Sequence, residues 1–207
     1  YKEKISYAIY GGEYDNTSYL FDIITKFEIF EKNNTLFLKN VINNYLNYSP
    51  KITSGNLRIS FSNKLPASET QLFHRDGSGH RFLKIFSYLH DVELENGPLT
   101  FVKKSHKDKF KFKDEVKLRH EEKEIRSRYN RNSIIFLNAK KTDLIIADTS
   151  GFHRGTKNIK ERVMLTLNFH AHSEVFRNTK LVVSQSVYNK MKETWGKKYV
   201  KYLEYLI

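Results

Sequence analysis

Two side chains that can bind a divalent metal stand two positions apart in the segment His74-Arg75-Asp76. Alternate residues of an extended chain point to the same side, so the imidazole of His74 and the carboxylate of Asp76 can bind one ion from the end of a single strand. With a second histidine from elsewhere in the fold, they would complete a site of two imidazoles and one carboxylate, which leaves coordination positions open in mononuclear iron enzymes. The segment therefore predicts a metal site.

The His-x-Asp spacing also arises by chance, so the surroundings must decide between the candidates. The spacing recurs at His106-Lys107-Asp108, and His120 and His172 each precede a glutamate by two positions. His106 lies among four lysines, whose charges oppose a divalent cation. His120 lies in a highly charged stretch with no evident rigid scaffold. His74 instead follows an apolar pair and precedes a glycine-rich turn, which suits a functional site better.

The second histidine is expected on a different strand. His153 lies 77 residues after Asp76 and follows an apolar run and a glycine-containing turn. Arg162 opens the next apolar run nine positions later, so a loop between two strands can place both side chains beside one cavity. The planar guanidinium of Arg162 is suited to holding a carboxylate through two hydrogen bonds. His170 and His172, on that same later run, are competing ligands.

The spacing of apolar residues divides the chain into three zones. Residues 17–47 carry two apolar stripes at helical spacing, which indicate two helices joined by a turn at Asn33-Asn34. Short strand-like runs separated by turn residues follow, at 57–61, 82–88, 99–102, 134–137, 144–147 and 163–169. Residues 107–131 interrupt them with dense charge and are expected to form an exposed helical or flexible insertion. Helical spacing returns at 184–207.

This order of elements predicts a mainly β fold with flanking helices, of the sandwich or jelly-roll kind. We expect one domain over 1–207, with a helical N-terminal part at about 17–47, a β core at about 55–172 and a C-terminal helix at about 184–207. The apolar stripes expected to pack on the core are Leu36, Val41, Tyr45 and Leu46 in the second N-terminal helix, and Val187, Met191, Trp195, Tyr199 and Leu203 in the C-terminal helix.

Composition excludes several kinds of chemistry. The 207 residues include no cysteine, so disulfides, thiolate metal sites, iron–sulfur clusters and cysteine nucleophiles are excluded. The net charge of +13 favours an anionic partner, although lysine that is abundant along the whole chain accounts for it as well. No apolar run approaches the ~18 residues that span a bilayer. The first residues do not resemble a signal peptide, and a cytoplasmic location is expected.

An ordered set of motifs resembles the phytanoyl-CoA dioxygenase family of Fe(II)- and 2-oxoglutarate-dependent oxygenases. The matching segments are His74-Arg75-Asp76, Leu83 to Val92, Glu95-Asn96-Gly97-Pro98-Leu99, Ser105-His106-Lys107, His153-Arg154-Gly155 and Arg162. They cover about half of the chain, from Gln71 to Phe169. The resemblance implies a double-stranded β-helix (jelly-roll) core with flanking helices.

The resemblance also implies roles for single residues. His74, Asp76 and His153 would bind iron. Arg162 would pair with the distal carboxylate of 2-oxoglutarate, and Lys84 matches a recurrent basic position that faces the site. His106 falls on an element where a structural role is expected. The chain departs from its relatives at His80, where an aromatic residue is common, so the family's substrate is not carried over.

The implied activity is a dioxygenase reaction in which O₂ and 2-oxoglutarate yield succinate, CO₂ and a hydroxylated substrate. Related halogenases replace the carboxylate ligand with a small residue, so Asp76 indicates hydroxylation or a related oxidation and not halogenation. A small or carrier-linked anionic metabolite is the expected substrate. One alternative is the same chemistry on nucleic acid, because aromatic residues alternate with lysines at 109–113. Another is a catalytically silent jelly-roll that binds a ligand or a protein.

Overall fold

A computed structural model gives the fold and describes residues 7–10, 32–47, 51–62, 64–77, 82–108, 117–141, 143–170, 181–183, 185–197, 200 and 203–205. Its larger sheet contains, in spatial order, β1 (Tyr7–Tyr10), β2 (Lys51–Ser60), β8 (Arg162–His170), β3 (Phe82–Tyr88) and β6 (Leu144–Ala147). All neighbours in this sheet are antiparallel. Its smaller sheet contains β5 (Ile134–Leu137), β4 (Leu99–Val102) and β7 (His153–Gly155), also antiparallel.

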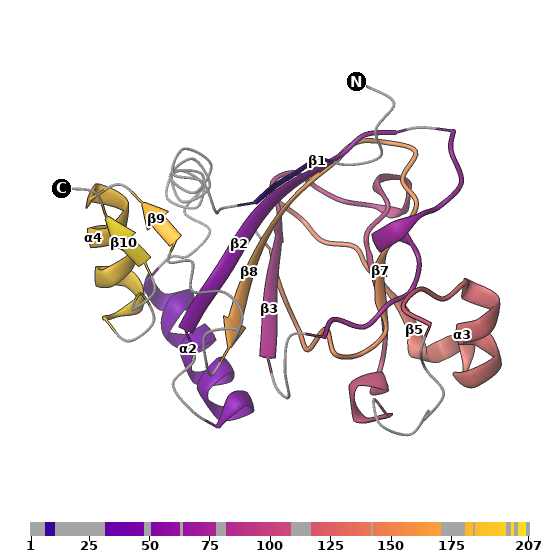
Figure 1. Ribbon diagram of the computed structural model, residues 1–207, viewed down its shortest axis with the longest axis horizontal. Coiled ribbons are helices and arrows are strands. Elements are labelled where there is room, and N and C mark those ends of the chain that lie inside the picture. Colours follow the sequence, from indigo (N-terminus) through magenta and orange to yellow (C-terminus); the bar gives the residue numbers. More distant parts are fainter. Residues whose placement is uncertain are drawn as a thin grey trace.

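All six strand-like runs predicted from the sequence are strands, and the mainly β fold with flanking helices is confirmed. In the part of the chain that the structure describes, the helices are α2 (Lys32–Leu46), α3 (Glu122–Arg128) and α4 (Gln185–Trp195), with short 3-10 turns η1 (Glu69–Gln71), η2 (Leu94–Asn96), η3 (Ser105–Asp108) and η4 (Arg131–Ser133). Figure 1 shows α2 and α4 on one side of the larger sheet, and the smaller sheet with α3 on the other. The strands β1, β7, β9 (Leu181–Val183) and β10 (Leu203–Tyr205) were not predicted.

The two faces of the larger sheet have different surroundings, and successive side chains of each strand alternate between them. One face packs against α2 and α4 and forms the largest apolar cluster. That cluster includes Leu57, Leu83, Ile85, Leu165, Leu167 and Phe169 from the sheet, Leu38, Ile42 and Leu46 from α2, and Met191 and Trp195 from α4. The opposite face carries Lys84, Arg162 and Thr166 and borders a cavity.

The cluster under the helices should dominate the stability of the fold. Leu167 is 0% exposed, and Leu167→Ala is expected to lower the free energy of unfolding by about 2–5 kcal/mol, because it removes apolar contacts and leaves a void. Urea denaturation measures the change. Ile159→Ala is the control, because Ile159 is 64% exposed and the expected change is within about 0.5 kcal/mol. Equal losses in the two variants would contradict this account of the core.

The N-terminal helical prediction needs two corrections. Helix α2 begins at Lys32, so Asn33-Asn34 lie in its first turn and not between two helices. Its buried side chains are Leu38, Ile42 and Leu46, which recur every four residues and so share one face. Of the predicted stripe only Leu46 is buried, while Leu36 is 64% exposed. The other predicted helix, before residue 32, lies outside the described residues.

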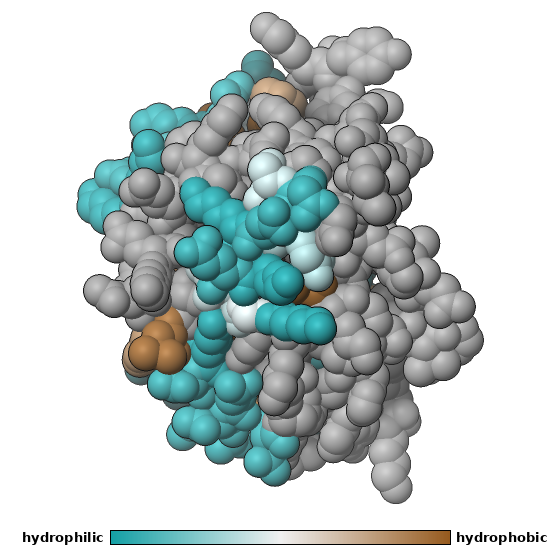
Figure 2. Space-filling view, turned by 90° about the vertical axis from the view of Figure 1, so that its left-hand side faces the viewer, coloured by the Kyte–Doolittle hydropathy of each residue, from teal (hydrophilic) through white to brown (hydrophobic). Residues whose placement is uncertain are grey.

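The C-terminal helix is shorter than the predicted span of 184–207. It ends at Trp195, because Gly196 has a φ of +90° and its N–H donates to the carbonyl of Lys192, which closes the last turn. Residues Leu203–Tyr205 form a strand, β10, which pairs in parallel with β9 (Leu181–Val183). Met191 and Trp195 are buried as predicted. Figure 2 faces the α2 and α4 end and shows the described surface there as mainly hydrophilic.

The charged stretch at 107–131 is helical at α3, as predicted, but it is not simply exposed. Ile125 is 0% exposed and packs with Phe73, Val102 and Phe152 in a separate apolar cluster. His120 is buried, and its main chain pairs with Phe73. The stretch therefore supplies part of the support for the segment that follows Phe73, which is a correction of the prediction. Residues 109–113, with their alternating aromatic pattern, lie outside the described residues.

Candidate metal centre

Two histidines and one aspartate converge beside the smaller sheet. The potential ligand atoms of His74, Asp76 and His153 all lie within 4.8 Å of one another. Nε2 of His74 is 3.9 Å from Oδ1 of Asp76, and Nε2 of His153 is 3.4 Å from Oδ2. The centroids of the two imidazole rings are 4.3 Å apart. The structure thus brings together the three residues that were predicted as ligands.

Main-chain hydrogen bonds hold the two histidines side by side, although 79 positions separate them. The N–H of His74 donates to the carbonyl of His153 at 2.9 Å, and the reverse bond measures 3.0 Å. The N–H of Asp76 donates to the carbonyl of Thr149 at 2.9 Å. The ligand segment is therefore paired with the chain around β7, which gives a short motif a fixed position.

Arg75, between the two ligands, anchors the segment from its other side. Alternation along the chain directs its side chain away from the cavity. Its guanidinium donates to the carbonyls of Ser105 and Ser150, both at 2.8 Å, and lies 3.9 Å from the centre of the Phe152 ring. These contacts tie the ligand segment to η3 and to the turn before β7.

Both imidazoles are oriented with the nitrogen needed for metal binding towards the aspartate. Nδ1 of His74 lies 2.9 Å from the carbonyl of Leu72, and Nδ1 of His153 lies 2.9 Å from the carbonyl of Gly151. A carbonyl only accepts, so each Nδ1 donates and carries the proton, which leaves the lone pair on Nε2. Such a hydrogen bond on the other ring nitrogen is typical of histidines that bind metals.

The pKa values of His74 and Asp76 also favour binding of a metal cation. Burial lowers the pKa of His74 to about 3, and the neighbouring His153 contributes to the lowering, so the imidazole is neutral near pH 7. Burial raises the pKa of Asp76, but the adjacent His153 and the ion pair with Lys84 outweigh it and hold that pKa below its usual range. Two imidazoles and one carboxylate form the donor set that suits a divalent iron ion.

Lys84 faces the site from β3, and its partner there is the aspartate. Its Nζ is 2.7 Å from Oδ2 of Asp76, and both side chains are less than one-fifth exposed. The lysine therefore neutralises the carboxylate from the side of the larger sheet. The sequence prediction had placed Lys84 on the cosubstrate, and in this structure its ion pair is with a candidate ligand.

Arg162 is buried at the start of β8 with most of its hydrogen-bonding capacity unused. It is 3% exposed, and one terminal nitrogen donates to Oγ of Ser60 at 3.2 Å. Its Nε and other terminal nitrogen have no partner among the residues that the structure describes. Burial lowers its pKa to about 10, so the guanidinium keeps its charge at neutral pH. A buried cation in this state requires an anion for compensation.

A cavity of about 110 Å³ joins the candidate metal ligands to Arg162. Arg58 and Thr70 also line it, and neither was predicted as a site residue. Arg58 could have been found from the alternation of Leu57-Arg58-Ile59-Ser60, because a charged residue on the inward face of a half-buried strand needs a reason. Nothing in the local sequence singles out Thr70.

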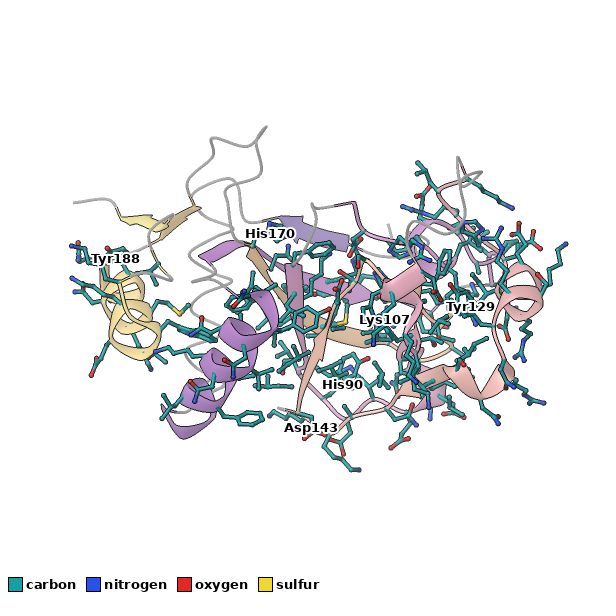
Figure 3. All side chains as sticks on the ribbon, turned by 90° about the horizontal axis from the view of Figure 1, so that it is seen from below. His90, Lys107, Tyr129, Asp143, His170 and Tyr188 are labelled. Carbon is teal, nitrogen blue, oxygen red and sulfur yellow. The ribbon has the colours of Figure 1, made fainter. Side chains whose placement is uncertain are left out.

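The other candidate histidines do not join this group. His170 is buried at the end of β8 and makes an edge contact with Phe82, with ring centroids 5.3 Å apart. Figure 3 places it well away from Lys107 and Tyr129, which lie towards the smaller sheet. His106 lies on η3, and His120 packs against Phe152. His80 and His172 lie outside the described residues.

Fold and site together define a jelly-roll protein with a candidate 2-His-1-carboxylate centre. The family model described as "Phytanoyl-CoA dioxygenase (PhyH)" matches residues 36–162, which is more than half of the chain. The protein therefore belongs to the phytanoyl-CoA dioxygenase family. None of the curated proteins matches the sequence. Among the helices in the described part of the chain, none is long and apolar enough to cross a membrane.

Solved structures with a similar fold share little sequence with the chain. EvdO2 from Micromonospora carbonacea var. aurantiaca is 13% identical, with a TM-score of 0.53 over 84% of this chain and 70% of its own. SnoN, a non-heme alpha ketoglutarate dependent epimerase from nogalamycin biosynthesis, is 12% identical, with a TM-score of 0.52 over 82% and 62%. EctD from S. alaskensis, solved with bound Fe, is 18% identical, with a TM-score of 0.49 over 65% and 49%. The chain thus spans less than two thirds of SnoN and of EctD.

Proposed function

We propose that the protein is an Fe(II)- and 2-oxoglutarate-dependent dioxygenase that hydroxylates a C–H bond of a small or carrier-linked anionic metabolite. The observation that carries this proposal is the shared cavity of three candidate iron ligands and one buried, underused guanidinium. Membership of the phytanoyl-CoA dioxygenase family supports it. SnoN is an epimerase, so hydroxylation is inferred from the carboxylate ligand Asp76 and not from that neighbour.

The chain's own residues would bind the cosubstrate at its two ends. His74, Asp76 and His153 would hold the iron, which supplies the oxidative decarboxylation of 2-oxoglutarate and the oxidation of the substrate. Arg162 would bind the distal carboxylate. A Cβ on Gly155 would lie 2.9 Å from the Arg162 guanidinium, so that group lies beside Gly155. Gly155 follows His153 by two strand positions, about 6.6 Å. This spacing suits a short dicarboxylate that reaches from the metal to the arginine.

Lys84 would act through Asp76. By pairing with Oδ2, it leaves Oδ1 as the oxygen for the metal and keeps the carboxylate from rotating. Arg75 and the main-chain bonds to β7 would hold the ligands against displacement when cosubstrate and substrate exchange. The cavity wall formed by the larger sheet would limit access of water to the reacting carbon.

The decisive experiment is anaerobic titration of the protein with Fe(II) and 2-oxoglutarate, followed by visible absorption and by succinate release after oxygen is admitted. The expected result is a weak visible band together with slow succinate production in the absence of substrate. His74→Ala should abolish both, because it removes a ligand, whereas His106→Ala should keep both, because His106 lies outside the candidate site. If wild type gives neither signal, a silent jelly-roll that binds a ligand or protein would replace the proposal.

Gly155→Ala offers a milder test of the cosubstrate site. The added methyl group would push against both terminal nitrogens of Arg162, at 2.9 and 3.4 Å. We expect the Kd for 2-oxoglutarate to rise about tenfold or more, because a displaced guanidinium no longer meets the carboxylate. The Kd for Fe(II) should stay unchanged. Calorimetry with each ligand measures both values, and an unchanged Kd for 2-oxoglutarate would place the distal carboxylate elsewhere.

The proposal extends to the organisation and location of the protein. Residues 1–207 would form one catalytic domain in the reducing cytoplasm, where ferrous iron persists. The alternative of a nucleic-acid substrate depended on residues 109–113, which lie outside the described residues, so no observation favours it over a metabolite. We infer that the metabolite is anionic because the cavity is lined by the cationic side chains of Arg58, Lys84 and Arg162.

A further inference from the structure

Arg58 is a second arginine in the candidate cavity. It lies on β2 opposite Met164 of β8, while Ser60 lies opposite Arg162. Residues in these diagonal positions of an antiparallel pair share a face and lie within reach of each other's long side chains. Both arginines line the cavity that also contains the candidate metal ligands. The charge of Arg58 contributes to the lowered pKa of Arg162, after burial, which indicates that the two guanidiniums repel each other.

Among the described residues, the hydrogen-bond partner of the Arg58 guanidinium is neutral. One terminal nitrogen donates to Oγ1 of Thr70 on η1 at 2.9 Å. Its Nε is buried and has no partner within the part of the chain that the structure describes. The partly buried Arg154 differs, because it pairs with Glu122 at 2.6 Å. No carboxylate among the described residues pairs with Arg58.

The charges of the cavity leave Arg58 uncompensated. The described lining contains three cations, Arg58, Lys84 and Arg162, and one anion, Asp76, which is paired with Lys84. Under the proposed function, 2-oxoglutarate would bring two carboxylates, of which one meets the metal and the other Arg162. One guanidinium would then still lack an anion, and a partly buried charge without a partner is costly.

We propose that Arg58 binds an oxyanion of the primary substrate, either a carboxylate or a phosphate, and so selects anionic substrates. This inference rests on the proposed function, because it takes Arg162 as the cosubstrate's partner. Thr70 holds the Arg58 side chain across the space between β2 and η1, so its remaining N–H groups are fixed in advance. A planar guanidinium with two free N–H groups matches a carboxylate or phosphate through two parallel hydrogen bonds.

The test uses the full chain loaded anaerobically with Fe(II) and saturating 2-oxoglutarate, titrated by calorimetry with inorganic phosphate in one arm and acetate in the other. We expect the wild type to bind at least one of these oxyanions. Arg58→Gln should weaken that binding about tenfold or more while the Kd for 2-oxoglutarate stays unchanged. Arg131→Gln is the matched control, because it removes the same charge from an exposed residue on η4 and should bind like wild type.

Each outcome bears on a different statement. Preference for phosphate supports a phosphorylated substrate, and preference for acetate a carboxylated one. Equal binding by wild type and Arg58→Gln overturns the proposal, since Arg58 would then only brace Thr70. Loss of 2-oxoglutarate binding in Arg58→Gln overturns it too, since Arg58 would then belong to the cosubstrate site. If Arg58→Gln does not fold, Arg58→Met replaces it, because methionine also removes the charge, and unchanged oxyanion affinity in that variant overturns the proposal.

Failure of the proposed function gives a separate signal. Wild-type protein that binds neither Fe(II) nor 2-oxoglutarate would remove the dioxygenase proposal. The phosphate and acetate titrations of the metal-free wild type and Arg58→Gln would still show whether Arg58 binds an oxyanion.

Discussion

Arg162→Gln is expected to raise the Kd for 2-oxoglutarate by about 30- to 5,000-fold, which corresponds to about 2–5 kcal/mol for losing one partner of a buried charged pair. Arg162 is 3% exposed, and two of the three nitrogens of its guanidinium have no partner among the described residues. Glutamine is polar but shorter than arginine and carries no charge, so the variant removes the cation from the cavity. Calorimetry on the iron-loaded protein without oxygen measures the change.

Two comparisons make this result specific. The Kd for Fe(II) should stay the same, because Arg162 is not one of the three candidate ligands. Arg162→Lys should retain part of the affinity, since it keeps the charge but loses the planar pair of N–H groups. An unchanged Kd for 2-oxoglutarate in Arg162→Gln would mean that another cation of the cavity, Lys84 or Arg58, carries the contact.

Asp76→Asn is expected to weaken Fe(II) binding by about 100- to 5,000-fold, from about 3–5 kcal/mol for breaking a buried ion pair. The variant removes the anionic ligand and leaves the Lys84 ammonium beside two imidazoles without its partner at 2.7 Å. Repulsion between that ammonium and the ion adds to the lost ligand. Titration with Fe(II) under anaerobic conditions, followed by calorimetry, measures the change.

A double variant separates these two contributions. Lys84→Met added to Asp76→Asn should recover part of the lost affinity, because it removes the unpaired cation. Lys84→Met alone should alter the visible band of the iron and 2-oxoglutarate complex, since Asp76 loses the group that orients it. Equal Fe(II) affinity in wild type and Asp76→Asn would contradict the assignment of Asp76 as a ligand.

Much of the candidate site was predictable because its chemistry depends on residue type and short spacing. The pair His74 and Asp76 needs only the alternation of an extended chain, and the surroundings separated it from His106. His153 and Arg162 were predicted because a turn and a following strand bring residues near in sequence to one cavity. The main-chain pairing of His74 with His153 leaves no trace in local sequence, because any residue can form it.

The errors have physical causes in tertiary contacts and in one backbone conformation. The buried face of α2 is set by the sheet beneath it, so Leu38 and Ile42 are buried where Leu36 and Tyr45 were expected. Helical spacing continues past Trp195, but the left-handed Gly196 ends the helix there. The burial of Ile125 was not predicted, because its neighbours in the sequence are charged residues that face solvent.

The reciprocal main-chain hydrogen bonds between His74 and His153 bring the two histidines together without a metal, so folding of the chain does not require metal binding. Closing a loop of this length costs conformational entropy, which rises slowly with the number of residues enclosed. In this chain the isolated main-chain bridge between His74 and His153 closes the loop, whereas in small zinc domains the ion must do so, and those domains unfold when it is withdrawn. Iron should therefore bind to and dissociate from the folded protein reversibly. Its binding free energy should reflect metal coordination alone, with no contribution from the free energy of folding.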